Sequence, residues 1–304
     1  MSASVTVRVP AKVNVQLAVG AARADGFHDL ANVFLAVGLY DEVTATPAAE
    51  LRVTCEGPDA ALVPLDRTNL AARAALALAA RYGIEPDVHL HIVKDIPVAG
   101  GMAGGSADGA GALLACDALW GTGASRDELL EICAELGSDV PFSLVGGAAL
   151  GTGRGERLTV LPVGGAFHWV FAMADRGLST PAVFREFDRL TAGTDVPAPV
   201  ASEDLLAALA KGDTDALAAA LPHSNDLQPA ALSLYPELAA TLDAGLRAGA
   251  LAALVSGSGP TTAFLVSDPD AASRVAGALA ASATCRTTRT TSAPARGATV
   301  THHA

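Results

Sequence analysis

The 304-residue sequence has few aromatic and few charged residues, at 4% and 17% of the chain. Hydrophobic residues make up 51%, and alanine supplies much of that share. Such a chain is too apolar to be disordered, and we expect finely packed aliphatic cores. Its length suffices for two ordinary domains or one large one.

Basic residues are also scarce. Twenty Lys and Arg stand against 32 Asp and Glu, which gives a formal net charge of −12. This charge argues against a general surface for nucleic acid or anionic membrane. It leaves room for one local basic pocket that binds a phosphorylated small molecule.

Long apolar runs and cysteine motifs are missing as well. No run of about 18 uninterrupted apolar residues occurs, and the first residues lack the apolar core of a signal peptide. The four cysteines, Cys55, Cys116, Cys133 and Cys285, form no Cys-x-x-Cys pair. We therefore expect a cytoplasmic protein with buried, reduced thiols and no membrane partner.

Glycine is plentiful, and four glycines fall within Pro97–Asp108. A strand-like run, Val88–Val93, precedes this stretch, and Gly109–Trp120 follows it with helical spacing. Glycines let backbone N–H groups approach an oxyanion, and a helix start adds unpaired N–H groups. The stretch therefore predicts a phosphate-binding loop, with a merely flexible turn as the alternative.

This loop lacks the lysine of Gly-x-x-x-x-Gly-Lys-Ser/Thr and does not match Gly-x-Gly-x-x-Gly, so both common nucleotide signatures are disfavoured. Any cation at a bound phosphoryl group must then come from elsewhere in the chain. Upstream, two alternating strand-like runs are separated by Pro10. The polar face of the second run carries Lys12 and Asn14, which makes it either the wall of a site or an exposed sheet face.

Further elements follow from local patterns. We expect helices over Leu70–Tyr82 and Asp127–Leu136, capped by Asn69 and Ser125. His89 and His91 share one face of a strand and lack a third ligand, so we expect structural histidines and no metal site. The tail with His302 and His303 is expected to be disordered.

Three features together are more specific than any one: Pro10-Ala11-Lys12-Val13-Asn14, Pro97-x-x-x-Gly101-Met102-Ala103-Gly104-Gly105-Ser106, and Gly257-Ser258-Gly259-Pro260. In this order and at these separations they resemble the GHMP kinase superfamily. The resemblance extends over almost the whole chain through Ala24-Asp25-Gly26-Phe27-His28, Leu136-Gly137-Ser138-Asp139-Val140-Pro141-Phe142, Ser179-Thr180-Pro181-x-x-Phe184 and Ser224-Asn225-Asp226-Leu227.

The resemblance implies an α+β protein with the two-domain GHMP kinase fold. Residues 1–160 would form a domain like the second domain of ribosomal protein S5, and residues 161–304 a ferredoxin-like domain. ATP, with Mg²⁺, and the substrate would meet in the cleft between them. The implied reaction phosphorylates the 2-hydroxyl group of cytidine diphosphate methylerythritol, in the non-mevalonate route to isoprenoid precursors.

Three alternatives stay open. One is another small-molecule GHMP kinase, of the homoserine or mevalonate type, whose substrate would lack cytosine. Another is a non-catalytic GHMP-fold protein that binds a metabolite and regulates. The last is an unrelated α+β binding domain with glycine-rich turns, which would leave the spacing of three motifs as coincidence.

The resemblance implies that Lys12 and Asp139 are the catalytic pair. Asp139 would accept or orient the proton of the 2-hydroxyl group. Lys12 would keep Asp139 ionised, because a neighbouring cation lowers the pKa of a carboxyl group, and would offset charge on the phosphoryl group. From the residues alone, Asp139 is equally a helix cap or turn residue.

Backbone N–H groups of the glycine loop would hold the phosphates of ATP. The Ser106 hydroxyl would touch a phosphate or the Mg²⁺, which would keep most of its waters because the sequence offers no dedicated carboxylate cage. The implied ATP site comprises Pro97, Val98, Ala99, Gly100, Gly101, Met102, Ala103, Gly104, Gly105, Ser106 and Ala107.

The implied substrate site is aromatic. Phe27 and Phe184 would sandwich the cytosine ring, and His28 would read its hydrogen-bonding edge, with Asn14 and Thr180 nearby. Without the resemblance, the two phenylalanines would be core residues.

Two positions depart from the family pattern. Ala103 stands where glycine is usual, and we expect a slightly different loop path because alanine avoids positive φ. Phe27 stands where tyrosine is frequent, so a ring can still stack but a phenol hydrogen bond is lost.

Overall fold

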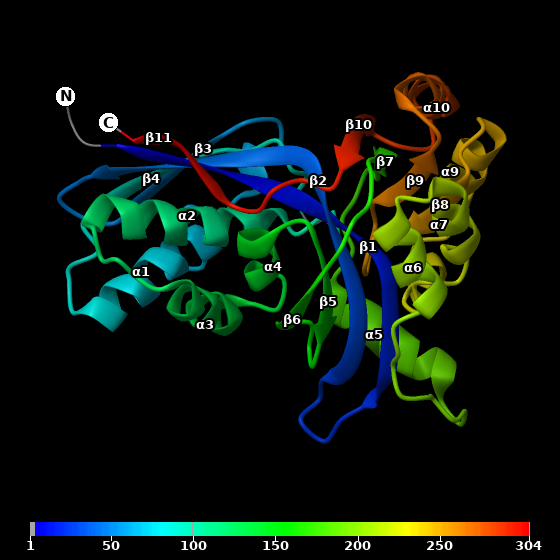
Figure 1. Ribbon diagram of the computed structural model, residues 1–304, viewed down its shortest axis with the longest axis horizontal. Helices are drawn as coiled ribbons and strands as arrows, with labels where there is room; N and C mark the ends of the chain where they lie inside the picture. Colours follow the sequence, from blue (N-terminus) through cyan, green and yellow to red (C-terminus); the bar gives the residue numbers. More distant parts are fainter. Residues whose placement is uncertain (1–3, 99, 304) are drawn as a thin grey trace.

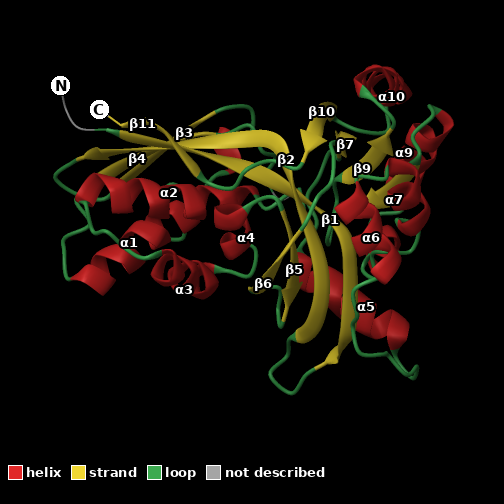
Figure 2. Cartoon of the chain, viewed as in Figure 1, coloured by secondary structure: helices red, strands yellow, loops and turns green. Residues whose placement is uncertain are grey.

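The computed structural model describes residues 4–98 and 100–303, which form two sheets with helices packed on their faces (Figures 1 and 2). The strands are β1 (Val5–Ala22), β2 (His28–Pro47), β3 (Arg52–Glu56), β4 (Val88–Val93), β5 (Ala148–Thr152), β6 (Arg157–Leu161), β7 (Phe167–Met173), β8 (Ala252–Val255), β9 (Thr262–Val266), β10 (Thr287–Ala293) and β11 (Thr299–His303). The helices are α1 (Leu70–Tyr82), α2 (Gly104–Trp120), α3 (Arg126–Leu136), α4 (Val140–Val145), α5 (Thr180–Thr191), α6 (Glu203–Lys211), α7 (Thr214–Ala220), α8 (Gln228–Leu234), α9 (Glu237–Arg247) and α10 (Pro269–Ser282), with a 3₁₀ turn, η1, at Ala60–Leu62.

The larger sheet places β1 and β2 at its centre. Its described strands run in the order β11-β1-β2-β4-β3, with β5 beside β2 and β6 beside β5. β1 and β2 are 18 and 20 residues long, and their antiparallel hairpin extends well past the other strands (Figure 1, blue). Helices α1 to α4 cover one face of this sheet (Figure 2), and the hairpin's free end stands beside α5.

The smaller sheet has the order β10-β7-β9-β8 and is antiparallel throughout. Side chains alternate across β7, as the period of a strand requires. Val170 and Ala172 pack with residues of α10, whereas Trp169 and Phe171 belong to the cluster that includes residues of α6 and α7. Both faces are therefore covered by helices.

The last strand returns to the larger sheet. β11 pairs with β1, with His303 opposite Val5 and His302 opposite Thr6, and the two strands lie side by side in Figure 1. The prediction of a disordered tail is therefore wrong, because β1 offers a sheet edge with which the tail pairs. The division at residues 1–160 and 161–304 stays a prediction.

Local patterns predicted several elements well. Helix α1 has the predicted bounds, and the Asn69 side chain accepts a hydrogen bond from the Ala71 N–H as an N-cap. By contrast, β1 continues through Pro10, with only a register shift against β2 after it. Cys116 and Cys133 are buried, but Cys55 and Cys285 are half-exposed, so the prediction of four buried thiols is wrong for two of them. No helix among the described residues is long and apolar enough to cross a membrane.

Candidate active site

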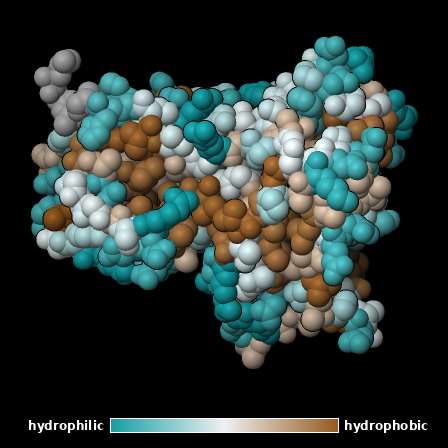
Figure 3. Space-filling model, in the orientation of Figure 1, coloured by the Kyte–Doolittle hydropathy of each residue, from teal (hydrophilic) through white to brown (hydrophobic). Residues whose placement is uncertain are grey.

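A cavity of about 660 Å³ lies between the β1–β2 hairpin, the first turn of α2 and helix α5. Figure 3 shows hydrophobic side chains gathered along the hollow between the two lobes of the molecule. Most of the residues predicted from the sequence meet on the cavity wall, although they are spread over more than half of the chain. They are Lys12, Asn14, Phe27, His28, Gly100, Gly101, Ala103, Gly104, Gly105, Ser106, Asp139, Thr180 and Phe184.

Four other predicted residues do not line this cavity. Met102 and Ala107 are fully buried in the main core. Pro97 and Val98 line smaller cavities instead, and the Val98 N–H donates to Asp59. Ala99 lies outside the described residues. The part of the loop that faces the cavity is therefore shorter than the stretch predicted for ATP.

Ala103 adopts the backbone conformation that glycine favours. Its φ and ψ are 60° and 33°, and it is the N-cap residue of α2. The expectation that alanine would avoid positive φ here is therefore wrong. A single left-handed alanine costs roughly 1–2 kcal/mol, which the packing around the loop outweighs. Helix α2 starts at Gly104 rather than at Gly109, and its first three residues line the cavity.

Lys12 is the centre of the polar wall. Its ammonium nitrogen lies 2.5 Å from Asn14 Oδ1, 2.8 Å from the Gly101 carbonyl oxygen and 3.6 Å from Asp139 Oδ2. Burial lowers the pKa of Lys12, and the charge of Asp139 together with its hydrogen bond opposes that shift. Two hydrogen-bond acceptors and one ion-pair partner thus surround the ammonium group and partly offset the cost of burying its charge.

Asp139 is positioned to face the cavity. It precedes α4 as the N-cap residue, but its side chain makes no capping hydrogen bond. The carboxylate is 33% exposed, whereas the Lys12 side chain is only 6% exposed. The helix-cap alternative for Asp139 therefore does not describe what its side chain does.

Asn14 is held in turn by a residue that sequence reasoning missed. The Asn14 amide donates to Asn32 Oδ1 at 2.8 Å, which leaves the Asn14 oxygen turned to Lys12. Both asparagines are buried and lie on the neighbouring strands β1 and β2. The alternation of β2 places Asn32 on a face, but only the register with β1 brings it to Asn14.

The two glycine-rich loops support each other through Gly101. Its φ is 73°, and a Cβ atom there would lie 2.4 Å from the Ser256 carbonyl oxygen, so the two backbones meet without room for a side chain. The Gly101 carbonyl accepts from the Ser256 hydroxyl at 3.2 Å as well as from Lys12. On the second loop, the Asn225 amide donates to the carbonyls of Val255 and Gly257.

The far end of the cavity carries the aromatic residues. Phe27 is 49% exposed at the hairpin turn, and the Arg154 guanidinium lies 5.0 Å from its ring centre. The His28 ring lies 5.0 Å from that of Phe184, and its Nε2 is 2.8 Å from Asp188 Oδ1. Phe184 packs against a hydrophobic cluster and His28 is buried, but Phe27 is exposed, so the core alternative fails for Phe27 alone.

Sequence reasoning missed three charged residues on this wall: Arg154, Arg185 and Asp188. Helix α5 carries Phe184, Arg185 and Asp188 at the spacing of one helical face, and that spacing is readable from the sequence once the helix is assigned. Arg154 lies in the turn between β5 and β6, and no local pattern marks it.

Comparison with known proteins gives the class first. The GHMP kinases N terminal domain matches residues 69–147, and the GHMP kinases C terminal domain matches residues 205–284. The predicted two-domain GHMP kinase fold is thereby confirmed. The class is that of ATP-dependent small-molecule kinases.

Individual relatives narrow the class. The 4-diphosphocytidyl-2-C-methyl-D-erythritol kinase of Streptomyces avermitilis is 80% identical over 297 residues, covering 98% of this chain and 99% of the relative. The enzyme of that name from Thermobifida fusca is 60% identical over 305 residues, covering 98% of both. The chain therefore belongs to the GHMP kinase superfamily and, within it, to the family of 4-diphosphocytidyl-2-C-methyl-D-erythritol kinases.

Solved structures agree with this placement. A crystal structure of 4-(cytidine 5'-diphospho)-2C-methyl-D-erythritol kinase has a TM-score of 0.75 at 32% identity, covering 95% of this chain and 99% of that one. Homoserine kinase from Cytophaga hutchinsonii has a TM-score of 0.73 at 22% identity, covering 98% and 97%. The second likeness shows the shared fold alone.

The contact between the two glycine loops can be tested by stability. Gly101→Ala is expected to lower the free energy of unfolding by at least about 2 kcal/mol, since it adds positive-φ strain and an overlap with the Ser256 carbonyl. Gly105→Ala is the matched control in the first turn of α2, where a Cβ would meet only Leu70 Cδ1 at an ordinary 3.7 Å. Urea unfolding measures both, and an equal effect of the two changes would contradict the assigned contact.

Proposed function

We propose that the chain transfers the γ-phosphoryl group of ATP to the 2-hydroxyl group of 4-diphosphocytidyl-2-C-methyl-D-erythritol, in the non-mevalonate route to isoprenoid precursors. The observation that carries the proposal is one cavity that joins the Lys12–Asp139 pair, the start of α2 and the exposed Phe27 ring. The names of the relatives supply the acceptor. A cytoplasmic location, expected from the cysteines, stays a prediction.

The start of α2 suits the phosphates. The first N–H groups of a helix have no partner within the helix and carry the positive end of its dipole. Gly104, Gly105 and Ser106 occupy this position and line the cavity. Their N–H groups would bind the phosphate oxygens of ATP, and Lys12 would offset the charge that develops on the transferring group.

Asp139 suits the acceptor hydroxyl. Its partly exposed carboxylate can accept the proton of the 2-hydroxyl group, and the Lys12 ammonium group lies 3.6 Å from it. Phosphoryl transfer needs mainly positioning and charge stabilisation, so a lysine and a carboxylate held in fixed geometry meet its main demands.

Magnesium would bind between the phosphates and the protein. The Ser106 hydroxyl is an oxygen ligand on the cavity wall, which fits a hard cation that prefers oxygen and keeps most of its waters. When bound, Mg²⁺ supplies further neutralisation of phosphate charge. Among residues 4–98 and 100–303, no group of three or more His, Cys, Asp or Glu is arranged to hold a metal.

The aromatic end suits a cytidine diphosphate. Phe27 and Phe184 offer ring faces for a pyrimidine, and Asp188 fixes the His28 ring beside them through its 2.8 Å contact. Arg154 and Arg185 supply cations on the same wall for the diphosphate. A homoserine or mevalonate acceptor has no base to stack, and a purely regulatory protein has no need of the Lys12–Asp139 pair.

The proposal is tested with the purified protein, ATP and Mg²⁺ in a coupled assay of ADP release. We expect ADP release with 4-diphosphocytidyl-2-C-methyl-D-erythritol and none above background with mevalonate or homoserine. Folded protein that gives no ADP with the cytidyl substrate would overturn the proposal. Release with one of the other two acceptors would favour the corresponding alternative.

The role of Asp139 predicts a loss confined to turnover. Asp139→Ala is expected to lower kcat at least about a hundredfold, because no carboxylate then takes the proton of the substrate hydroxyl group. ATP binding is expected to be retained. Steady-state kinetics and calorimetric ATP binding measure the two effects. Asp243→Ala, which removes an exposed carboxylate on α9, is the control and is expected to leave kcat unchanged. Near-normal turnover of the Asp139 variant would remove this residue from its role.

The role of Phe27 predicts a loss confined to the cytidyl substrate. Stacking on a base contributes about 1–3 kcal/mol, so Phe27→Ala should raise the KM for that substrate about 5- to 150-fold and leave the KM for ATP unchanged. Phe27 is half exposed, so truncation costs little folding energy. Phe27→Tyr is the matched control and should behave like the parent chain. An unchanged KM in Phe27→Ala would place the base elsewhere.

A further inference from the structure

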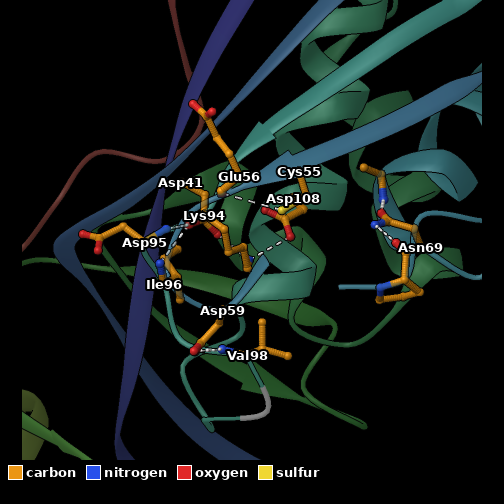
Figure 4. A network of polar contacts seen from close by, with 12 residues as sticks. Asp41, Cys55, Glu56, Asp59, Asn69, Lys94, Asp95, Ile96, Val98 and Asp108 are labelled. Carbon is orange, nitrogen blue, oxygen red and sulfur yellow. Dashed lines mark hydrogen bonds and ion pairs between the residues drawn. The ribbon is translucent and has the colours of Figure 1, made fainter. Parts of the chain in front are cut away.

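A buried lysine lies between two carboxylates beneath the glycine loop (Figure 4). Lys94 Nζ is 2.5 Å from Asp41 Oδ2 and 2.7 Å from Asp108 Oδ2. The three side chains are at most 3% exposed and come from β2, the end of β4 and α2. None of them lines the cavity, and neither the motifs nor the proposed mechanism uses them.

Stability of the fold alone does not account for this triad. Two carboxylates and one ammonium must all leave water, and a buried ion cluster often contributes no more than apolar residues of the same volume. Asp108 Oδ1 has no hydrogen-bond partner among the described residues, so the cluster is not fully satisfied. Burial opposes the charge of Lys94, but the two carboxylates outweigh it and raise its pKa, so Lys94 stays a cation.

The position of the triad points to the loop. Asp41 Oδ1 accepts the N–H groups of Asp95 and Ile96, each at 2.8 Å, and so fixes the chain as it leaves β4 toward the loop (Figure 4). Lys94 Nζ lies 2.9 Å from where a Cβ of Gly104 would be, directly against the first residue of α2. Asp108, one turn further along α2, ties that turn to Lys94.

The loop is thus fixed from two sides by two lysines. Lys12 binds the Gly101 carbonyl from the cavity side, whereas Lys94 contacts Gly104 and belongs to the interior. The loop itself carries no lysine, and because Asp41 and Asp108 balance the charge of Lys94, the contribution of Lys94 to the loop is positional.

We propose that Lys94, oriented by Asp41 and Asp108, is a positioning residue for ATP: it fixes the first turn of α2 so that the N–H groups of Gly104 to Ser106 converge on the phosphates. The proposal rests on ATP binding at the glycine loop and not on the identity of the acceptor. This role differs from that of a purely structural residue, because removal of the Lys94 charge should weaken the binding of ATP and not that of other ligands.

The test compares ATP and CDP binding by calorimetry in three variants. Lys94→Met keeps the length of the side chain and removes its charge, and should weaken ATP binding about tenfold or more while CDP binding changes less than about twofold. Asp108→Asn keeps an acceptor for Lys94 and should weaken ATP binding about threefold, again selectively. Leu279→Ala, at a fully buried position of α10, is the control that lowers the melting temperature without changing either affinity.

Each outcome decides the question. Folded Lys94→Met with unchanged ATP affinity overturns the proposal, as does an equal loss for ATP and CDP. If Lys94→Met fails to fold, Asp108→Asn decides, and unchanged ATP affinity in it is then the contrary result. A matching ATP loss in Leu279→Ala would show that general destabilisation suffices and would also overturn it. ATP binding needs no acceptor, so inactivity of the parent chain on the cytidyl substrate would refute the proposed function, whereas the ATP affinities of the three variants would still test the role of Lys94.

Discussion

The ammonium group of Lys12 is the interaction on which the site depends. A buried cation needs an acceptor for each N–H, and here the three acceptors come from β1, the glycine loop and the start of α4. Moving any of these elements would leave part of that charge unpaired in the interior. The glycine loop and Asp139, to which we assign phosphate binding and proton acceptance, are therefore fixed relative to each other by one group.

Contacts between the two halves of the chain also fix the cavity. The second glycine loop follows β8 of the smaller sheet, yet its Ser256 hydroxyl binds the Gly101 carbonyl of the first loop. The final strand crosses back to pair with β1, the strand that carries Lys12. The cavity thus belongs to neither sheet alone, and its geometry forms only when both sheets have folded and docked.

These contacts explain which features the sequence could predict. Asn69 caps α1 and Ser125 caps α3, because those interactions lie within a few residues of each other. Lys12, Asp139 and the glycine loop were found because they stand in spaced motifs that resemble a family. The left-handed conformation of Ala103 was not predicted, because tertiary packing imposes it. The Asp41–Lys94–Asp108 triad was not predicted either, because Lys94 lies 53 positions from Asp41 and 14 positions from Asp108 in the sequence. From the sequence, Asp41 cannot be distinguished from an ordinary polar residue of a strand until the register of β2 and β4 is known.

Different structural elements form the two ends of the cavity, and substitutions can change one end without the other. The proposed phosphate side consists of the N–H groups at the start of α2 and of Lys12, and none of these groups would have to contact the acceptor's base. The acceptor side consists of the hairpin turn with Phe27 and the exposed face of α5, both at the edge of the fold. Because phosphoryl transfer asks the protein for position and charge rather than covalent chemistry, substitutions at that edge can alter the acceptor without disturbing the transfer. Asp139 lies beside Lys12 on the same wall, so under the proposed function it is the carboxylate that the acceptor hydroxyl approaches.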